Sequence, residues 1–246
     1  MLPFRADQLL DFWEQYLDQP LVRTGIGLLA LAEPGTDADT LAGLSISERD
    51  EKLLALRTRI FGPGLRSIAD CPECSQKVEW ENDTGDIFSS VEKPPGPEQE
   101  HICEKDGYRI CYRLPDSNDL SAATGPDGVD VPEDDFLREL ILSCTFDGQD
   151  CSPGEIPLPV LEALGLCIEK ESPFADIRME LKCANCGHQW EVQFDILSYL
   201  WQEIRSWAEH TLSETASLAL SYGWSEKEIL GMSPARRQLY LEMATP

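Results

Sequence analysis

Two short cysteine pairs, far apart in the sequence, constrain the fold more than any other feature of this chain. One pair lies in Cys71–Cys74 and the other in Cys183–Cys186, and strand-like residues follow each of them. Two CxxC turns can each present two thiolates to one tetrahedral Zn²⁺ ion. Gly187, directly after the second pair, has the backbone freedom that such a tight turn requires. We therefore expect a zinc ribbon divided by a long insertion, with four zinc ligands: Cys71, Cys74, Cys183 and Cys186.

Other interpretations of these cysteines make different predictions. A redox-active pair needs a thiol that is activated at the start of a helix, and we expect neither pair to open one. His188, close behind Cys186, is an alternative ligand in place of one sulfur. Four protein ligands leave no coordination position for a substrate, so the expected role of the zinc is structural.

Five further cysteines lie in the region between the two pairs. Cys103 and Cys111 would face each other if their two strands form a hairpin, which would allow a second metal site. The alternative, which we favour, is that all five are small buried side chains. They are Cys103, Cys111, Cys144, Cys151 and Cys167.

Composition indicates a globular protein without a membrane span. The chain has 246 residues, 42% of them hydrophobic, which suffices for a packed core. It contains no apolar run long enough to form a transmembrane helix, and its first residues lack the pattern of a secretory signal. The odd number of cysteines, 9, and their CxxC spacing favour reduced thiols. We therefore expect a cytoplasmic protein.

The charge of the chain is strongly negative, with a formal net value of −25. Residues 87–180 hold 21 acidic and 7 basic residues and carry most of the excess. Such a field repels nucleic acid, because duplex binding depends on cations that displace condensed counterions. It also attracts basic surfaces of other proteins. Nucleic acid is thus not an expected partner.

The hydrophobic pattern predicts an α+β fold in four regions. A helical unit is expected over 1–65, with helices at 6–18, at 21–32 and from Ser47 onward. The split zinc ribbon covers 66–86 and 181–194, with a strand at 176–181 leading into its second part. An acidic α/β insertion occupies 87–180, and a long helix with a small helical tail occupies 195–246. No internal repeat is evident beyond the paired cysteine turns.

The insertion and the C-terminal region carry more detailed predictions. In the insertion we expect an extended lead at 93–97, a hairpin around 105–107, a turn at 126–128, and helices at 134–144 and 158–170. Residues 195–222 predict the longest helix, capped by Asp195 and ended by Gly223. Its expected buried stripe includes Leu212, Ala216 and Ala219. A capping box at 225–228 and Pro234 begin two short helices.

Motifs of catalysis are nearly absent from the sequence. It contains no GxSxG, HExxH, P-loop or complete GxGxxG pattern. None of the three histidines, His101, His188 and His210, has an evident partner. We predict that the protein is not an enzyme; a hydrolase stays an alternative only because carboxylates are plentiful.

Aromatic and arginine side chains gather toward the C-terminus, and three interpretations stay open. The spacing is similar to a helix-turn-helix, in which Arg236 and Arg237 would contact phosphate, or the residues form a protein-docking face. A third interpretation is a helical cap that buries its own aromatic rings. The candidate partner-binding residues are Trp201, Trp207, Tyr222, Trp224, Arg236, Arg237 and Tyr240.

Together these segments resemble the T-even-type phage baseplate hub assembly chaperone family, which also occurs in gene clusters of contractile injection systems. The resemblance covers most of 45–245 and is densest over 183–242; its specific parts are Tyr222–Glu226 and the Arg-Arg-x-x-Tyr of 236–240. It implies a non-enzymatic assembly chaperone that binds the hub or spike protein of a contractile tail. By the same resemblance the four cysteines are the metal ligands and the C-terminal helices are a docking surface. The alternative function is a zinc-ribbon nucleic-acid-binding or transcription-associated factor.

Overall fold

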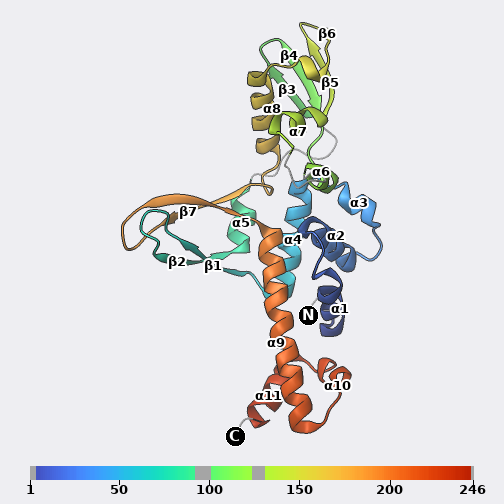
Figure 1. Ribbon diagram of the computed structural model, residues 1–246, viewed down its shortest axis with the longest axis vertical. Coiled ribbons are helices and arrows are strands. Elements are labelled where there is room, and N and C mark those ends of the chain that lie inside the picture. The colour runs from blue at the N-terminus through green and yellow to red at the C-terminus, as the bar shows by residue number, and fades with distance from the viewer. Residues whose placement is uncertain (1–3, 92–100, 124–130, 245–246) are drawn as a thin grey trace.

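The computed structural model describes residues 4–91, 101–123 and 131–244, and its fold is of mixed α/β type. A helical body occupies the centre, a lobe with a β-sheet lies at one end, and two hairpins project to the side (Figure 1). The long helix α9 runs from the body to the opposite end, where the chain ends. The predicted lead at 93–97 and the predicted turn at 126–128 lie outside the described residues.

The helical body packs around the apolar stripes of four helices. Two glycines of the helix Leu21–Ala32 allow neighbouring side chains to pack closely against its backbone. A Cβ atom at Gly25 would lie 2.9 Å from Leu197, and one at Gly27 would lie 2.4 Å from Tyr16. These glycines therefore serve helix packing. The helices are α1 (Ala6–Tyr16), α2 (Leu21–Ala32), α4 (Ile46–Phe61) and the first half of α9 (Ile196–Tyr222), with the short α3 (Ala38–Ala42) beside them.

The start of α4 differs from the prediction by two residues. Ser45, rather than Ser47, is the N-cap: its hydroxyl accepts a hydrogen bond from the backbone N–H of Glu48, whose carboxylate accepts from the N–H of Ser45 in return. Ser47 is buried instead, and its hydroxyl accepts from the N–H of Phe174. It thereby joins α4 to the chain that leads into the second cysteine pair.

Two antiparallel hairpins project from the body (Figure 1). Each carries one cysteine pair at its tip, between its two strands. Both hairpins alternate in burial along their strands, so each has one apolar and one charged face. A helix follows each hairpin directly: α5 (Thr84–Ser90) after the first and α9 after the second. The strands are β1 (Gly64–Asp70), β2 (Lys77–Asp83), β7 (Ile177–Lys182) and β8 (Gln189–Phe194), of which β7 confirms the strand predicted at 176–181.

The inserted lobe has a four-stranded antiparallel sheet in the order β3-β4-β5-β6 and a core of its own. The predicted turn at 105–107 is present, because β3 and β4 are joined by Asp106 and Gly107, both at positive φ. The strands are β3 (His101–Lys105), β4 (Tyr108–Tyr112), β5 (Ile141–Phe146) and β6 (Gln149–Asp150). The helices are α6 (Ser117–Ala123), α7 (Glu133–Glu139), the 3-10 turn Pro153–Glu155 and α8 (Leu158–Glu171).

The helix predicted at 134–144 is wrong in its second half. Helix α7 ends at Glu139, and β5 begins at Ile141 and pairs with β4 along its length. The same apolar residues fit a helix stripe or a short buried strand, and a backbone partner distant in the sequence decides between the two. As a result the lobe has a third long strand that the sequence did not indicate.

Hydrogen bonds join the lobe to the body at the start of α4. The backbone N–H of Ile46 donates to the carbonyl of Pro115 at 2.9 Å, and the guanidinium of Arg49 donates to the hydroxyl of Ser117 at 3.3 Å. Arg49 and its neighbour Asp50 are both buried and form an ion pair at 2.8 Å. The lobe is therefore fixed to the body at the start of α4.

Beyond the body, α9 carries the two last helices, α10 (Glu226–Leu230) and α11 (Pro234–Ala244), which fold back against its end (Figure 1). The predicted stop and capping box are confirmed: Gly223 adopts the left-handed conformation at φ 69°, and Ser225 and Glu228 form reciprocal hydrogen bonds. Among the described helices, none combines the length and the apolar character needed to cross a membrane.

Candidate metal centre

The structure brings the four predicted cysteines together between the tips of the two hairpins. Their ligand atoms all lie within 4.8 Å of one another. The closest sulfurs of opposite hairpins are 3.7 Å apart for Cys71 and Cys186 and 3.6 Å apart for Cys74 and Cys183. Four sulfurs about 2.3 Å from a tetrahedral metal are roughly 3.8 Å from one another. The four cysteines are thus close enough to bind one metal ion.

The same backbone geometry places the sulfurs in both turns. In the first turn, the N–H of Ser75 donates to the carbonyl of Cys71 at 2.8 Å, and the N–H of Cys71 donates to the carbonyl of Gln76. In the second turn, Gly187 and His188 hold the equivalent positions relative to Cys183, with 2.9 Å for the bond from Gly187. Each turn therefore directs two sulfurs to the same side.

The two turns differ in the residue that adopts positive φ. Ser75 has φ 56° and Gly187 has φ 76°. A glycine adopts this left-handed conformation without the steric cost that a Cβ atom brings. The first turn therefore has a conformational strain energy at Ser75 that the second turn, with glycine at this position, does not have.

Burial and hydrogen bonding make the four thiols unequal. Cys71 and Cys183 are each 1% exposed, whereas Cys186 is exposed to solvent. The side-chain amide of Asn185 donates to the sulfur of Cys74 at 3.6 Å and, with the backbone N–H of Gln76, lowers the pKa of that thiol to about 6. The His188 N–H lowers the pKa of Cys186, but partial loss of hydration and the adjoining sulfurs outweigh it and raise the pKa to about 12. A bound divalent cation removes this competition, because its charge favours the thiolate form of every ligand.

Histidine does not belong to this group. The four ligand atoms are all sulfur, and the ring of His188 lies beside the ring of Trp190, with the centroids 6.0 Å apart. His101 and His210 have acidic partners that the sequence did not indicate, Glu171 at 2.5 Å and Glu214 at 3.1 Å.

Four of the five remaining cysteines form two pairs, neither of which is the pair considered from the sequence. Cys103 lies opposite Ile110 in the hairpin, so it does not face Cys111; its sulfur instead lies 3.0 Å from that of Cys167 on α8. Cys144 and Cys151 have their sulfurs 2.7 Å apart. Over the ranges that the structure describes, these pairs join no third ligand, and the only group of three or more candidate metal ligands is the four-cysteine group.

Two of the seven candidate partner-binding residues are buried, and a third is partly buried. Trp201 is 7% exposed and packs edge-on against Phe12 in the body, and Trp207 lies partly buried against the same core. Arg237 is 3% exposed, because its guanidinium bonds with the carboxylate of Glu214 and the carbonyl of Met232. Trp201 and Arg237 therefore offer almost no surface to a partner, and contact through the other candidates stays a prediction.

The other candidates gather at the far end of α9. The rings of Tyr222 and Trp224 stack with centroids 4.4 Å apart, and Tyr240 packs edge-on against Trp224 at 4.8 Å. Arg236 is exposed. On the outer face of α11, Leu239 and Met243 are 55% and 72% exposed, and the sequence analysis did not select them. Their spacing of one helical turn would have placed them on one face.

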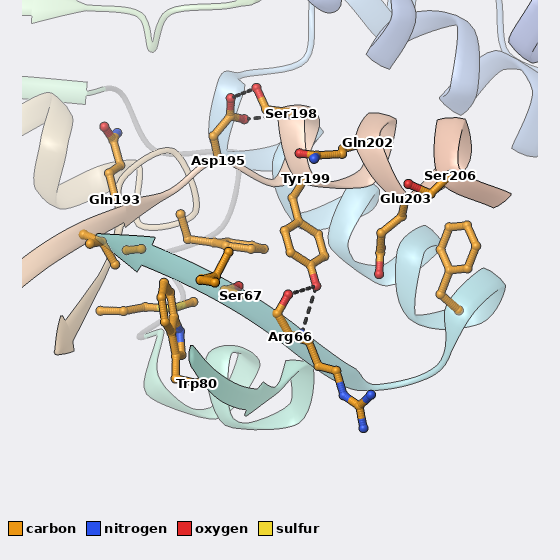
Figure 2. A pocket seen from close by; sticks show the side chains of 16 residues that line it. Arg66, Ser67, Trp80, Gln193, Asp195, Ser198, Tyr199, Gln202, Glu203 and Ser206 are labelled. Carbon is orange, nitrogen blue, oxygen red and sulfur yellow. Dashed lines mark hydrogen bonds between the residues drawn. The ribbon is translucent and has the colours of Figure 1, made fainter. Parts of the chain in front are cut away.

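The sequence analysis also missed a cavity of about 740 Å³ between the hairpins and the start of α9 (Figure 2). Trp80, Met179, Val192 and Phe194 provide its apolar lining. The hydroxyl of Tyr199 points to the backbone of Arg66 at one end of it. No sequence motif marks these residues, because the cavity forms only where two distant hairpins meet.

Comparisons with known proteins give no further indication of identity: no protein-family model, curated protein or solved structure matches this chain. The resemblance to baseplate hub assembly chaperones thus has no support from them. The geometry of the cysteine centre and of the exposed surfaces carries the functional argument.

Proposed function

We propose that the four cysteines hold a structural Zn²⁺ ion in a split zinc ribbon and that the protein acts without catalysis, by binding another protein. The observation that carries this proposal is the convergence of four sulfurs, all within 4.8 Å, from two hairpins that are distant in the sequence. Zinc favours thiolate ligands, and four of them complete its tetrahedral coordination. The metal would hold the two hairpins together, and it would have no coordination position left for a substrate.

Two features of the surface support binding of a protein. Apolar side chains are exposed at the outer face of α11, where Leu239 and Met243 lie, and in the cavity between the hairpins. The net charge of −25 favours association with a basic partner surface. Exposed apolar residues framed by charge are typical of protein-binding sites.

The client that we propose is the baseplate hub or spike protein of a contractile tail or tail-like particle. The sequence resemblance supports this choice, and its most specific parts, Tyr222–Glu226 and the residues from Arg236 to Tyr240, lie at the far end of α9. The protein would bind the client in the cytoplasm during assembly, as a chaperone or scaffold. Its aromatic end would be one docking surface.

A nucleic-acid-binding zinc ribbon is less well supported. Arg237 is buried in an ion pair with Glu214, so only Arg236 of the predicted arginine pair presents an exposed guanidinium to phosphate. The charge of −25 opposes the counterion release on which such binding depends.

The test combines metal analysis with capture of a defined client. We expect elemental analysis of the purified chain to give one zinc per chain, and a recombinant hub protein from a contractile tail cluster to co-purify with it at low salt. A matched variant with both Leu239→Ser and Met243→Ser should reduce capture, and Ser217→Ala on the exposed surface of α9 should not. Absence of zinc would contradict the metal site; failure to retain any hub component, or salt-sensitive DNA binding in a filter assay, would contradict the proposed function.

A further inference from the structure

The cavity between the hairpins is bordered by strand edges. It is lined by four consecutive residues of the first hairpin, 66–69, and by four consecutive residues at the end of the second, 192–195. A strand that presents its face to a cavity contributes every second residue, whereas a strand that presents its edge contributes neighbours. Strands β1 and β8 therefore turn backbone groups, as well as side chains, toward this space.

The hydrogen-bond pattern of the first hairpin shows which backbone groups face outward. Cys71 bonds to Gln76 at one end, and Thr84 bonds to Pro63 at the other. Antiparallel pairing alternates along a strand, so the odd-numbered residues of β1 bond to β2, and the even-numbered residues point their N–H and C=O groups away. The outward groups of β1 in the cavity are thus those of Arg66 and Ile68.

A tyrosine side chain occupies the first of these two positions. The hydroxyl of Tyr199 donates to the carbonyl of Arg66 at 2.9 Å and accepts from its N–H at 3.0 Å. One hydroxyl thereby takes the place that a residue of a neighbouring strand would hold. The bond pair also fixes the base of the hairpin to α9.

The second position is open. Within the described part of the chain, the outward N–H and C=O of Ile68 have no hydrogen-bond partner, and the side chain of Ile68 is 54% exposed. An unpaired strand edge is a template for another strand. The indole N–H of Trp80, also on the cavity wall, is buried without an acceptor in the described structure. Both features call for hydrogen-bonding groups that the described residues do not supply.

The side chains around this edge are apolar. Trp80 and Met179 come from the inner faces of the two hairpins, and Asn82 closes the base by a contact to the sulfur of Met179 at 2.9 Å. Val192 and Phe194 add apolar surface from β8. A space of about 740 Å³ accommodates several side chains of a ligand.

We propose that this cavity binds an extended segment of a partner protein, which pairs with the edge of β1 at Ile68 and places alternate apolar side chains against Trp80 and Val192. This inference rests on the proposed protein-binding function and defines the form of the client segment. Its remaining side chains would be lysine or arginine, because Glu79 lies on the outer face of the hairpin, opposite Ile68, and the chain carries a charge of −25. The neighbouring Glu81 is already paired with Arg66 at 2.7 Å. A second copy of this chain is a poorer occupant, since it would bring the same negative charge.

The probe is a fluorescein-labelled peptide, Lys-Val-Lys-Val-Lys-Val-Lys, titrated with the zinc-loaded full chain and followed by fluorescence anisotropy. We expect saturable binding that a Glu-Val-Glu-Val-Glu-Val-Glu peptide does not show. Ile68→Pro removes the outward N–H and should weaken binding at least tenfold. The matched control is Glu79→Pro: Glu79 lies directly opposite Ile68, and its N–H points away from the cavity at the other edge. It should change the affinity less than threefold.

A second measurement leaves the protein unaltered and so does not depend on how the proline variants fold. Peptides that carry N-methyl groups on the three valines, or on the internal lysines, each lose one alternate set of backbone donors. Pairing with a single strand edge predicts that one set abolishes binding and that the other has little effect. Equal loss with both peptides, absence of binding to the wild-type chain, or a dimer that Ile68→Pro dissociates would overturn the proposal. Undiminished capture of a hub protein by Ile68→Pro would overturn it while leaving the proposed function intact.

Discussion

The two cysteine hairpins have the same construction, although Cys71 and Cys186 are 115 positions apart. In each hairpin an aspartate lies at the end of the second strand, at the same interval from the cysteines, and caps the next helix. Asp83 is the last residue of β2 and caps α5, and Asp195 directly follows β8 and caps α9. A helix, α4 or α8, also precedes each hairpin. The repeated unit is therefore longer than the cysteine turns that the sequence revealed.

The units differ in what supports them. The helix after the first hairpin has 7 residues, and the helix after the second has 27 and forms the centre of the body. The first hairpin is instead held at its base by side chains: Arg57 donates to the carbonyl of Gly64 at 2.8 Å and pairs with Glu203 on α9, and Tyr199 bonds to Arg66. The second hairpin and its helix therefore support the body, and the first hairpin is attached to them by side-chain contacts.

The largest effect is expected from substitutions that test whether both hairpins are equally necessary for metal binding. Cys71→Ser and Cys183→Ser should each reduce zinc from one per chain to near zero, because each removes a buried ligand. Structural zinc contributes on the order of 10 kcal/mol in small domains, so amides of both hairpins should lose protection in hydrogen exchange while those of α4 and α9 keep it. Elemental analysis and exchange measured by mass spectrometry provide the readouts. Retention of zinc by only one variant would show that the two units are not equivalent.

The aspartate caps should give a smaller and unequal effect. Asp195 accepts from the N–H groups of Leu197 and Ser198, whereas Asp83 accepts from that of Gly85 alone. We expect Asp195→Ala to lower the free energy of unfolding by about 1–2 kcal/mol and Asp83→Ala by about 0.5–1 kcal/mol. Urea denaturation measures both.

The exposed substitution Glu209→Ala on α9 serves as control for these caps and should stay within about 0.5 kcal/mol of the wild type. A larger loss for Asp83→Ala than for Asp195→Ala would contradict the assignment of support to the second unit.

Exchange of the turn residues should give the smallest effect, with opposite signs in the two units. Ser75→Gly removes a Cβ atom from a residue at φ 56° and should stabilise the first turn by about 0.5–1 kcal/mol. Gly187→Ser introduces the same strain at φ 76° and should destabilise the second by about 1 kcal/mol. Thermal unfolding of the zinc-loaded variants gives the sign. If both substitutions changed the stability in the same direction, the two turns would have to differ in how their backbones adjust to the substituted residue.

Local patterns in the sequence predicted the cysteine centre and most helices, but not the burial along the second half of α9. The expected stripe included Leu212, Ala216 and Ala219, whereas the structure buries Thr211, Thr215 and Leu218. The hydroxyl of Thr215 donates to the carbonyl of Thr211 at 2.8 Å, so a residue that counts as polar is satisfied within its own helix and packs inward. This face of α9 is buried because α10 and α11 pack against its end. The hydrophobic periodicity of α9 does not show where those two helices lie.

The features that sequence analysis missed depend on contacts between distant segments. Strand β5 forms because β4 offers it an edge, and Trp201 is buried because α1 covers it. The open edge at Ile68 has no residue signature at all, since it consists of backbone groups. The spacing of residues within a motif can be read from the sequence. The burial of an aromatic side chain or the pairing of a strand edge depends on segments that meet only in the folded chain.

The position of the inserted lobe between the two cysteine pairs also orders events during synthesis. Cys71 and Cys74 leave the ribosome well before Cys183 and Cys186, and the whole of β3–β6 with α6–α8 is translated in the interval. The nascent chain can therefore fold the lobe around its own core first. Cys71 and Cys74 meet Cys183 and Cys186 only after the latter have been synthesised. Assembly of the four-cysteine group is therefore a late step, because it requires both hairpins to have been synthesised.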